Sequence, residues 1–348
     1  MELALYHPEH GFYSSGRATI GRSGDYFTNV SVGPLFGRLL VAQFVQIWEQ
    51  LGKSQNFVIV EQGAHHGDLA RDVLGSIRKS HPEFFDVLRY EIVDPLAPLR
   101  DRQSQVLKDF ENRVRWRQSL DDLEPFAGIH FSNELVDSMP VHMIVSTGDG
   151  WREEFVALMD GKFGFIEREI ADPALLAFVE RLPKRPAGYQ TEVNLAALDW
   201  IETLSKKMTR GYVLIIDYGF SRDQLYAADR VSGTLQVRRH HRISSSPFDG
   251  IGCADITTHI DWTSLAEHAE RYGLRVHSFT DQHHFLTGIL SHLPDLPADP
   301  KTKRALQTLL HPEMLGRAFQ VLALEKDVYA ETLSGFKYAR DPRIALGL

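Results

Sequence analysis

The stretch FVIVEQGAHHGDLA, residues 57–70, changes its local pattern twice within a short span. Its first part, FVIVE, is an apolar run that ends in an acid, which is typical of a strand buried inside a parallel sheet. Gly63 and Gly67 then flank a tight turn, since glycine adopts backbone conformations that other residues avoid. A helical pattern follows from about residue 67 to residue 80. The stretch therefore predicts a strand, a glycine turn and a helix in direct succession.

The same alternation continues along the chain. YEIVD at 90–94 predicts a second strand, and PLAPLRDRQSQVLKDF at 95–110 has its apolar positions at helical spacing. VRWRQ at 114–118 and GIHFSNE at 128–134 predict a third and a fourth strand. Strands that alternate with helices pair in parallel and carry helices on both faces. We therefore predict an α/β fold with a doubly wound, mostly parallel sheet.

The pattern changes after residue 150. WREEFVAL and KFGFIERE are separated by MDGK, whose Asp160-Gly161 pair is a hairpin signal, so we predict a β-hairpin inserted at about 150–190. NLAALDWIETLSKKM predicts a helix that ends at Gly211, and GYVLIIDYGF predicts another buried strand. The last part, with ITTHIDWTSLAEHAERYGL and RVHSFTDQHHFL, predicts one more helix and edge strands.

Two units follow from these patterns. Residues 1–55 form an N-terminal extension, in which a Gly-rich start precedes GPLFGRLLVAQFVQIWEQL, an amphipathic helix expected to pack over one end of the sheet. Residues 56–348 form the main domain, which carries the inserted hairpin. We find no internal repeat and no low-complexity linker.

Composition excludes several classes of function. The net charge is −8, and the most basic stretch, RRHHR at 238–242, is short enough to be a solvated loop, so no nucleic-acid partner is expected. Cys253 is the only cysteine, and many of the sixteen histidines fall in adjacent pairs that chelate poorly, so we expect no metal. No apolar run approaches the ~20 residues of a membrane span, and no targeting pattern precedes LYHP. We therefore expect a cytoplasmic protein that does not insert into membranes.

Ligands of open α/β sheets bind beyond the carboxyl ends of the strands. The predicted strands end in polar residues, namely Glu61, Asp94, Asn133, Glu134 and Asp217. A nucleotide-binding turn usually has a third glycine where His65 stands here. Asp94 stands where an acid can accept hydrogen bonds from two ribose hydroxyls. A helix N-cap ahead of Pro95 is an equally natural role for Asp94.

A series of further motifs occurs in a characteristic order. They are LYHPEHGFY (5–13), GDYFT (24–28), GPLFG (33–37), NELVDSMPV (133–141), DYGF (217–220), GTL (233–235), DITTHIDWTSL (255–265) and Gln282 with Phe285-Leu286. In this order they resemble the MidA-type methyltransferases, a bacterial and mitochondrial family whose mitochondrial member assists assembly of respiratory complex I. The resemblance covers essentially the whole chain. It implies a class I methyltransferase fold with seven strands, S-adenosylmethionine as methyl donor and a protein substrate, which is an arginine of a complex I core subunit for the mitochondrial member.

The family's cofactor turn has the pattern E-x-G-P-G-x-G-x-L. Glu61, Gly63, Gly67 and Leu69 match it, whereas Ala64 and His65 replace the proline and the middle glycine. The resemblance also implies that Gly24, Asp25 and Thr28 of GDYFT belong to the cofactor site, and that this loop closes over the cleft. Three further departures are Asp94 in place of a glutamate, Val30-Ser31 in place of Pro-Glu, and a start almost at LYHP, without the leading helix usual in relatives.

Methyl transfer from a sulfonium requires mainly an acceptor held in line with the methyl group. An arginine acceptor is cationic and planar, and suits carboxylates in a fork geometry. Glu134 and Asp137 lie three residues apart after a strand, where a helical turn would place both on one side. With Asp217 they are the expected catalytic residues. Alternatively, Glu134 caps a helix and Asp137 is solvated surface.

Other candidates have an ordinary structural alternative. Tyr218 and His259 suit the acceptor side, but a core tyrosine and a buried, hydrogen-bonded histidine are equally consistent with the sequence. Phe27 and Trp116 could stack near an adenine, although core packing is the better interpretation for both.

The sequence thus predicts an S-adenosylmethionine-dependent methyltransferase that acts on an arginine side chain of a protein, and the resemblance implies a role in respiratory complex assembly. The alternative is a non-catalytic adaptor that kept the fold and lost the cofactor, motivated by His65 and by Val30-Ser31. A Rossmann dehydrogenase is disfavoured because the turn lacks GxGxxG spacing. The target protein is not identified by the sequence, and a homo-oligomer is left open.

Overall fold

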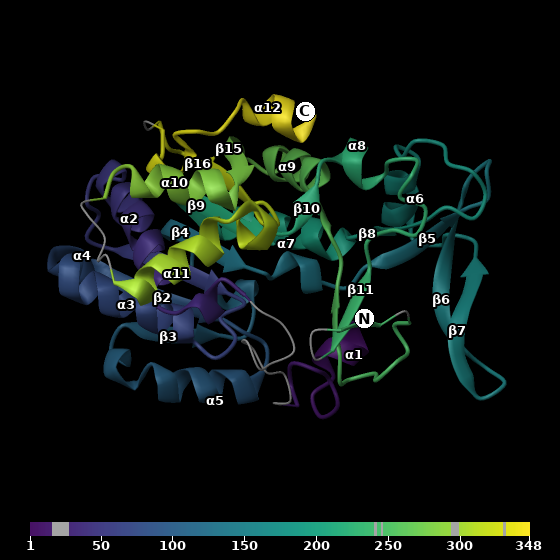
Figure 1. The fold of residues 1–348 in the computed structure, drawn as a ribbon, viewed down its shortest axis with the longest axis horizontal. Helices are drawn as coiled ribbons and strands as arrows, with labels where there is room; N and C mark the ends of the chain where they lie inside the picture. The colour runs from purple at the N-terminus through teal and green to yellow at the C-terminus, as the bar shows by residue number, and fades with distance from the viewer. Residues whose placement is uncertain (16–27, 240–241, 245, 294–298, 330–331) are drawn as a thin grey trace.

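A computed structural model describes residues 1–15, 28–239, 242–244, 246–293, 299–329 and 332–348 (Figure 1). Three predicted positions, Gly24, Asp25 and Phe27, lie outside these described residues. None of the helices in the described part of the chain combines the length and the apolar character needed to span a bilayer.

A seven-stranded sheet forms the centre of the molecule, in the order β15-β16-β9-β4-β1-β2-β3 (Figure 1). Its strands are β1 (Phe57–Gln62), β2 (Leu88–Val93), β3 (Val114–Arg117), β4 (Phe126–Asn133), β9 (Met208–Asp217), β15 (Arg275–Asp281) and β16 (Gln320–Lys326). The neighbours from β3 to β9 pair in parallel, whereas β16 is antiparallel to both β9 and β15. This confirms the predicted α/β fold with a doubly wound, mostly parallel sheet of seven strands.

Alternating side chains of the strands form two cores. One face carries Ile59 and Phe131 and packs against α2 (Leu35–Gln50), α3 (Asp68–Ser80), α10 (Gln282–Leu290) and α11 (Pro300–Leu310). The other face carries Val58 and Val60 and packs against α7 (Leu195–Lys207) and α9 (Trp262–Arg271). Burial of both faces explains why the strands are continuous apolar runs.

Helix α2 lies over a face of the sheet, so the expectation that it packs over one end is wrong. Its Phe44 meets Phe131 of the central strand β4 with ring centroids 5.7 Å apart. Most of its residues are buried because α3 and α10 flank it on the same face.

Gly211 does not end a helix, contrary to expectation. Helix α7 ends at Lys207, and Gly211 lies within β9 opposite Gly128 of β4. A Cβ on Gly211 would come within 1.8 Å of the Gly128 carbonyl oxygen, and φ is +135°. This glycine therefore permits two strands to approach closely, which a pattern of helical residues cannot reveal.

The predicted hairpin is present as β6 (Trp151–Met159) and β7 (Lys162–Arg168). It joins β5 (His142–Ser146) and β8 (Gln190–Val193) in a four-stranded sheet, with α6 (Pro173–Val179) between β7 and β8. The hairpin stands off the body at the right of Figure 1, and Val156, Leu158 and Phe163 on it are exposed.

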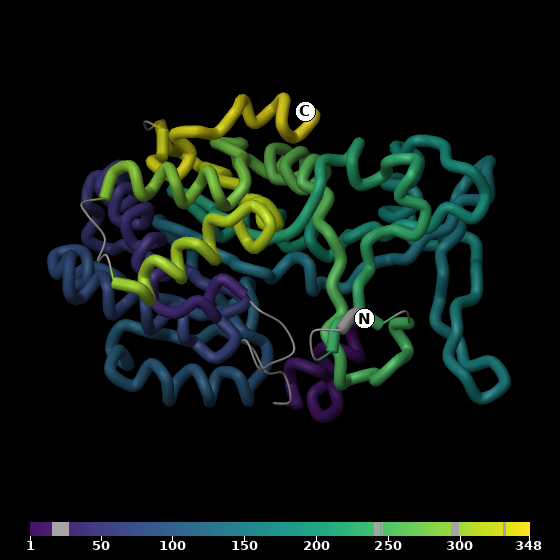
Figure 2. Tube along the Cα trace, in the orientation of Figure 1, coloured from purple at the N-terminus to yellow at the C-terminus, as the bar shows by residue number. Residues whose placement is uncertain are grey.

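The N-terminal residues pack far from α2. Helix α1 (Glu2–Tyr6) and Phe12 form a small core with the three-stranded sheet β12-β11-β13, as the adjacent purple and green segments of Figure 2 show. These strands are β11 (Gln236–Arg239), β12 (Arg242–Ser244) and β13 (Asp255–Thr257). The stretch RRHHR therefore includes the ends of two paired strands, and is more than the solvated loop expected from the sequence.

The remaining elements are short or connect the layers. They are η1 (Val30–Val32), α4 (Pro82–Val87), α5 (Ala97–Val106), η2 (Lys108–Phe110), η3 (Leu120–Asp122), η4 (Val136–Ser138), β10 (Gly219–Phe220), α8 (Arg222–Leu225), β14 (Ile260–Asp261), η5 (Pro312–Gly316), η6 (Ser334–Phe336) and α12 (Pro342–Leu346). Strand β15, which comes from RVHSFTDQHHFL, is an edge strand as predicted, whereas β16 lies between β15 and β9 and was not predicted.

Candidate active site

A cavity of about 1180 Å³ opens at the carboxyl ends of the central strands. The strand order reverses between β1 and β4, which is where ligands of doubly wound sheets bind. Its walls include eight of the predicted residues: Thr28, Glu61, Gly63, His65, Asp94, Asn133, Glu134 and Asp137. Two other predicted residues, Gly67 and Asp217, are not among the residues that line the cavity.

The turn after β1 keeps the shape of a glycine turn despite its histidine. Gly63, His65 and Gly67 all have positive φ, at 81°, 44° and 85°. Histidine tolerates this left-handed region better than most residues with a Cβ. The turn therefore places backbone at the cavity wall and starts α3 directly after Gly67.

The imidazole of His65 is neutral. Burial lowers its pKa to about 3, and its ring lies 3.8 Å from that of His66. Its Nε2 is buried and has no hydrogen-bond partner within the described residues. A buried nitrogen without a partner beside a cavity is suited to a ligand that supplies a donor or an acceptor.

Glu61, at the start of this turn, is held by a tyrosine from the next strand. The Tyr90 hydroxyl donates to Oε2 of Glu61 at 2.6 Å, and burial raises the pKa of Glu61 to about 7. An ammonium group in the cavity would stabilise the ionised form of this carboxylate.

Asp94 is tied to the glycine turn through Gln103, which sequence reasoning missed. Gln103 Nε2 donates to Oδ2 of Asp94 at 2.7 Å and to the carbonyl of His65 at 2.8 Å. Its Oε1 accepts from the indole of Trp116 at 3.0 Å. Nothing in the polar helical run RDRQSQ distinguishes this glutamine from its neighbours. Trp116 packs against the core and does not line the cavity, as the better interpretation predicted.

The N-cap role expected for Asp94 is wrong, because α5 begins at Ala97 and its N-cap position is Leu96. Oδ1 of Asp94 accepts from the backbone N–H of Leu96 at 2.9 Å, which is a local turn ahead of α5. Asp94 also lines the cavity, where its carboxylate can accept a ribose hydroxyl.

Asp217 organises the loop that follows β4. Its Oδ2 accepts from the backbone N–H groups of Leu135, Val136 and Asp137, at 3.1, 2.9 and 3.4 Å. Its Oδ1 accepts from Tyr218 N–H at 2.8 Å. Asp217 is fully buried, so its carboxylate caps η4 from beneath and does not face the cavity.

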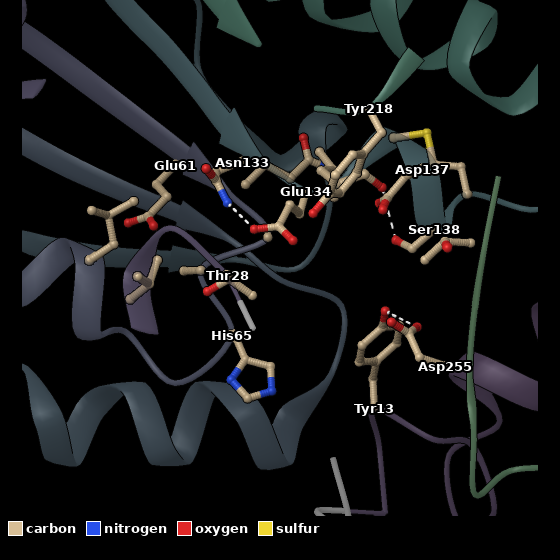
Figure 3. A pocket seen from close by; sticks show the side chains of 18 of the residues that line it. Tyr13, Thr28, Glu61, His65, Asn133, Glu134, Asp137, Ser138, Tyr218 and Asp255 are labelled. Atoms are coloured by element: carbon tan, nitrogen blue, oxygen red, sulfur yellow. Dashed lines mark hydrogen bonds between the residues drawn. The ribbon is translucent and has the colours of Figure 1, made fainter. Parts of the chain in front are cut away.

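Glu134 does not cap the following turn, because Asp217 performs that role. Its own φ is +56°, and its carboxylate accepts from Nδ2 of Asn133 at 2.8 Å. Burial, followed by the nearby charge of Asp217, raises the pKa of Glu134 to about 8. Figure 3 shows Glu134 next to Asn133, with Tyr218 and Asp137 beside it.

Asp137 is only 4% exposed, which rules out the solvated-surface alternative. Burial and the neighbouring acids Asp217, Asp255 and Glu134 raise the pKa of Asp137 well above its usual range. No ion pair engages Glu134 or Asp137 within the described part of the chain. Two uncompensated acids therefore share one end of the cavity.

The opposite wall of this end comes from the N-terminal residues and β13. The Tyr13 hydroxyl donates to Oδ1 of Asp255 at 2.6 Å (Figure 3), and the Tyr6 hydroxyl donates to the Ser138 carbonyl at 3.1 Å. Tyr13 and Asp255 belong to the motifs LYHPEHGFY and DITTHIDWTSL noted in the sequence. Their hydrogen bond joins positions 242 residues apart, so no local pattern could predict it.

Tyr218 and His259 line the same end of the cavity. The His259 ring stacks on Phe220 at 5.0 Å, and burial lowers the pKa of His259 to about 4, so it is neutral. The backbone N–H of His259 donates to the hydroxyl of Thr234 at 2.9 Å, in the GTL motif. Both residues thus contribute polar surface to the wall in addition to packing.

Comparison with known proteins identifies the chemistry. A family of S-adenosyl-L-methionine-dependent methyltransferases has a sequence model that matches residues 39–280, more than two thirds of the chain. The chain belongs to this family. The dehydrogenase and adaptor alternatives are therefore not retained, and the enzyme is a methyltransferase whose cofactor is S-adenosylmethionine.

Relatives agree with this assignment. The methyltransferase is 28% identical over 361 residues to protein arginine methyltransferase NDUFAF7, mitochondrial, from Rattus norvegicus. The aligned region covers 93% of this chain and 79% of the relative. For the protein of that name from Homo sapiens, identity is 27% over 380 residues, with coverage of 99% and 82%.

A solved structure is also similar. A protein from Burkholderia thailandensis bound to S-adenosyl-homocysteine matches with a TM-score of 0.87 and 29% identity, over 98% of this chain and 90% of that chain. The walls of the cavity fit such a cofactor. Positive-φ backbone at Gly63 opens a cradle, Glu61 suits an ammonium, and Asp94 suits ribose hydroxyls.

Proposed function

We propose that this methyltransferase acts on a protein and methylates an arginine side chain, which Glu134 and Asp137 bind. The observation that carries the proposal is the pair formed by the buried Asp137 and the half-buried Glu134, which has no cationic partner among the described residues. A buried carboxylate is costly unless it is paired or protonated. A guanidinium, which is planar and cationic, would compensate both acids in a fork geometry.

The cavity volume of about 1180 Å³ exceeds the roughly 300–1,000 Å³ of a typical small-molecule pocket, which supports binding of cofactor and acceptor together. S-adenosylmethionine, when bound, supplies a methyl group on a positively charged sulfonium. Glu134 and Asp137 orient one nitrogen of the acceptor toward that methyl group. Transfer of that methyl group would form a nitrogen–carbon bond while the carbon–sulfur electron pair stayed on sulfur, and the acceptor nitrogen would lose one proton. Glu134, whose pKa lies near neutrality, can accept that proton.

Asp217 acts in this proposal as a positioning residue. It holds the N–H groups of residues 135–137, and it thereby fixes the direction in which Glu134 and Asp137 point. Thr28, Gly63, His65, Gly67, Asp94 and Asn133 are proposed for the cofactor side, together with Glu61.

The finer assignments rest on sequence resemblance alone. We propose a respiratory complex I subunit as the target, because the motifs resemble a family with that role. A cytoplasmic location and a bacterial source remain part of the same proposal, whereas the relatives named above are mitochondrial proteins by name.

The test uses purified protein, S-adenosylmethionine with a labelled methyl group, and paired peptides that differ only in arginine or lysine. Label transfer to the arginine peptide, with S-adenosyl-homocysteine released in equal amount, supports the proposal. Transfer to the lysine peptide at the same rate, or to neither peptide while cofactor binds, would contradict the acceptor assignment.

A further inference from the structure

A chain of three side-chain amides ends on Glu134. Gln282, at the start of α10, donates from Nε2 to Oδ1 of Asn29 at 2.9 Å. Asn29 donates from Nδ2 to Oδ1 of Asn133 at 2.9 Å, and Asn133 donates from Nδ2 to Glu134 at 2.8 Å. The chain thus joins residues from three distant parts of the sequence.

The hydrogen bonds between these amides share one donor-to-acceptor direction. Gln282 Nε2 also donates to the backbone carbonyl of Leu309 in α11, at 3.2 Å, and a carbonyl can only accept. This contact fixes which end of the Gln282 amide faces Asn29, and each amide then fixes the next. The three hydrogen bonds that link these amides all run toward Glu134, and hydrogen bonds aligned in this way polarise one another.

Burial makes this arrangement specific. Asn29 and Gln282 are fully buried, and neither lines the cavity. Buried amides of this kind are costly unless they are hydrogen-bonded, so a structural role alone would be served by apolar residues. Asn29 also reaches Glu134 directly, through its backbone N–H.

We propose that Gln282 and Asn29 are positioning residues for methyl transfer, which act through Asn133 to favour ionisation of Glu134 and to fix its orientation. This inference rests on the proposed function, in which Glu134 binds the acceptor and takes its proton. Donors to a carboxylate favour the charged form, so the chain opposes the acids that surround Glu134.

The groups that face Glu134 come from several elements. Asp217 at the end of β9, Asp255 of β13 and Asp137 of η4 disfavour its ionisation, and Tyr218 lies close by. Within this set only the amides and the Asn29 backbone N–H favour the charged carboxylate. Removal of one amide should therefore move the titration of Glu134 to higher pH.

The test compares Gln282→Met with a matched control, Gln43→Met. Gln43 is also fully buried in a helix, and its amide bonds to Gly335 N–H and to Gln46, away from the cavity. The first measurement follows the Asn133 side-chain amide by ¹⁵N NMR against pH in protein free of substrate. We expect the midpoint in Gln282→Met to rise by about 0.5 pH unit, and the midpoint in Gln43→Met to match the parent.

The second measurement is the pH profile of transfer to the arginine peptide. Because a rise of about 0.5 pH unit lowers the ionised fraction roughly threefold below the pKa, kcat/KM at pH 7 should fall about threefold and recover at pH 9. The Kd for S-adenosylmethionine should not change. If Gln282→Met does not fold, Asn29→Ala removes the middle amide without adding a charge and should raise the same midpoint.

An unchanged midpoint in Gln282→Met and Asn29→Ala, or an equal shift in Gln43→Met, would overturn the proposal. The NMR measurement requires no acceptor, so it separates the two ideas. A shifted midpoint in a protein that methylates no arginine peptide supports the amide chain and contradicts the proposed acceptor. Normal methylation of the arginine peptide with an unshifted midpoint supports the proposed acceptor and contradicts the role of the amide chain.

Discussion

The two ends of the cavity differ in how their acids are bonded. At the glycine turn, Glu61 and Asp94 each have a neutral side-chain donor, Tyr90 and Gln103, so the site is assembled before any ligand arrives. At the other end, Glu134 also has a neutral donor, the Asn133 amide, but Glu134 and Asp137 are crowded by Asp217 and Asp255 and have no cation among the described residues. The glycine-turn end therefore suits the polar groups of a cofactor. At the other end, a cationic acceptor would stabilise the ionised forms of Glu134 and Asp137.

The largest expected effect is at the acceptor end. Glu134→Gln removes the charge that binds a guanidinium and takes its proton, and should lower the rate of methyl transfer by about 100-fold or more. The Kd for S-adenosylmethionine, measured by isothermal titration, should remain that of the parent. Glu167→Gln on the hairpin β6–β7 serves as a control with an exposed acid. Equal losses of activity and cofactor affinity would place Glu134 at the cofactor end instead.

The next effect tests the cofactor end. Asp94→Ala removes the acceptor for ribose hydroxyls and releases Gln103 from one of its partners. Cofactor binding should weaken by about 1–3 kcal/mol, the cost of leaving a hydrogen-bonded partner unpaired. Isothermal titration at one pH measures this change, and Asp101→Ala in α5, the helix that carries Gln103, is the control. If Asp94→Ala binds as tightly as the parent, the ribose role is wrong and only the turn ahead of α5 remains.

A smaller effect in the opposite direction is expected for His65→Gly. Glycine adopts the observed positive φ without strain, and it frees the space that the imidazole fills. Affinity for S-adenosylmethionine should rise about tenfold, or about 1.4 kcal/mol. Isothermal titration of the parent and of His65→Gly with S-adenosylmethionine measures this difference in affinity. Weaker binding by the variant would mean that the unpartnered Nε2 of His65 contacts the ligand.

The smallest effect concerns stability and sharpens the contrast between the two ends. Burial raises the pKa of Glu61 and of Asp217 to about 7, and of Glu134 to about 8, whereas unfolded carboxyls titrate near pH ~4. The folded protein therefore binds more protons than the unfolded chain between these values, so stability should fall as pH rises from about 4 to about 8. The Tm without ligand should drop by roughly 2–5 °C between pH 5 and pH 8.

In this experiment Glu134→Gln is the informative variant. Glutamine does not titrate, so the drop in Tm across the same pH range should be smaller. A Tm that rises toward pH 8, or a drop of the same size in Glu134→Gln, would contradict the raised pKa of Glu134.

Local sequence patterns determined the elements of this fold. Strand β1, the turn at Gly63 and Gly67, helix α3 and the hairpin β6–β7 each depend on neighbours in sequence, through side-chain periodicity and turn preference. The carboxyl ends of parallel strands must meet at one edge, so the placement of Glu61, Asp94 and Asn133 along the cavity also followed. The apolar run QVLALEK of β16 has the same local signal as β1, but its antiparallel position between β15 and β9 depends on strand pairing that no local pattern encodes.

Only the tertiary structure decided which polar groups act on one another. Gln103 joins Asp94 to the turn, Asp217 caps η4 in place of Glu134, and Gln282 reaches Glu134 through Asn29, over contacts that span up to 253 positions. Hydrogen bonds depend on distance and direction in space, and no periodicity along the chain encodes them. The raised pKa values have the same origin, because burial and neighbouring charge are properties of the folded cavity. The sequence therefore determined where the site lies, and the fold determined what each residue in it can do.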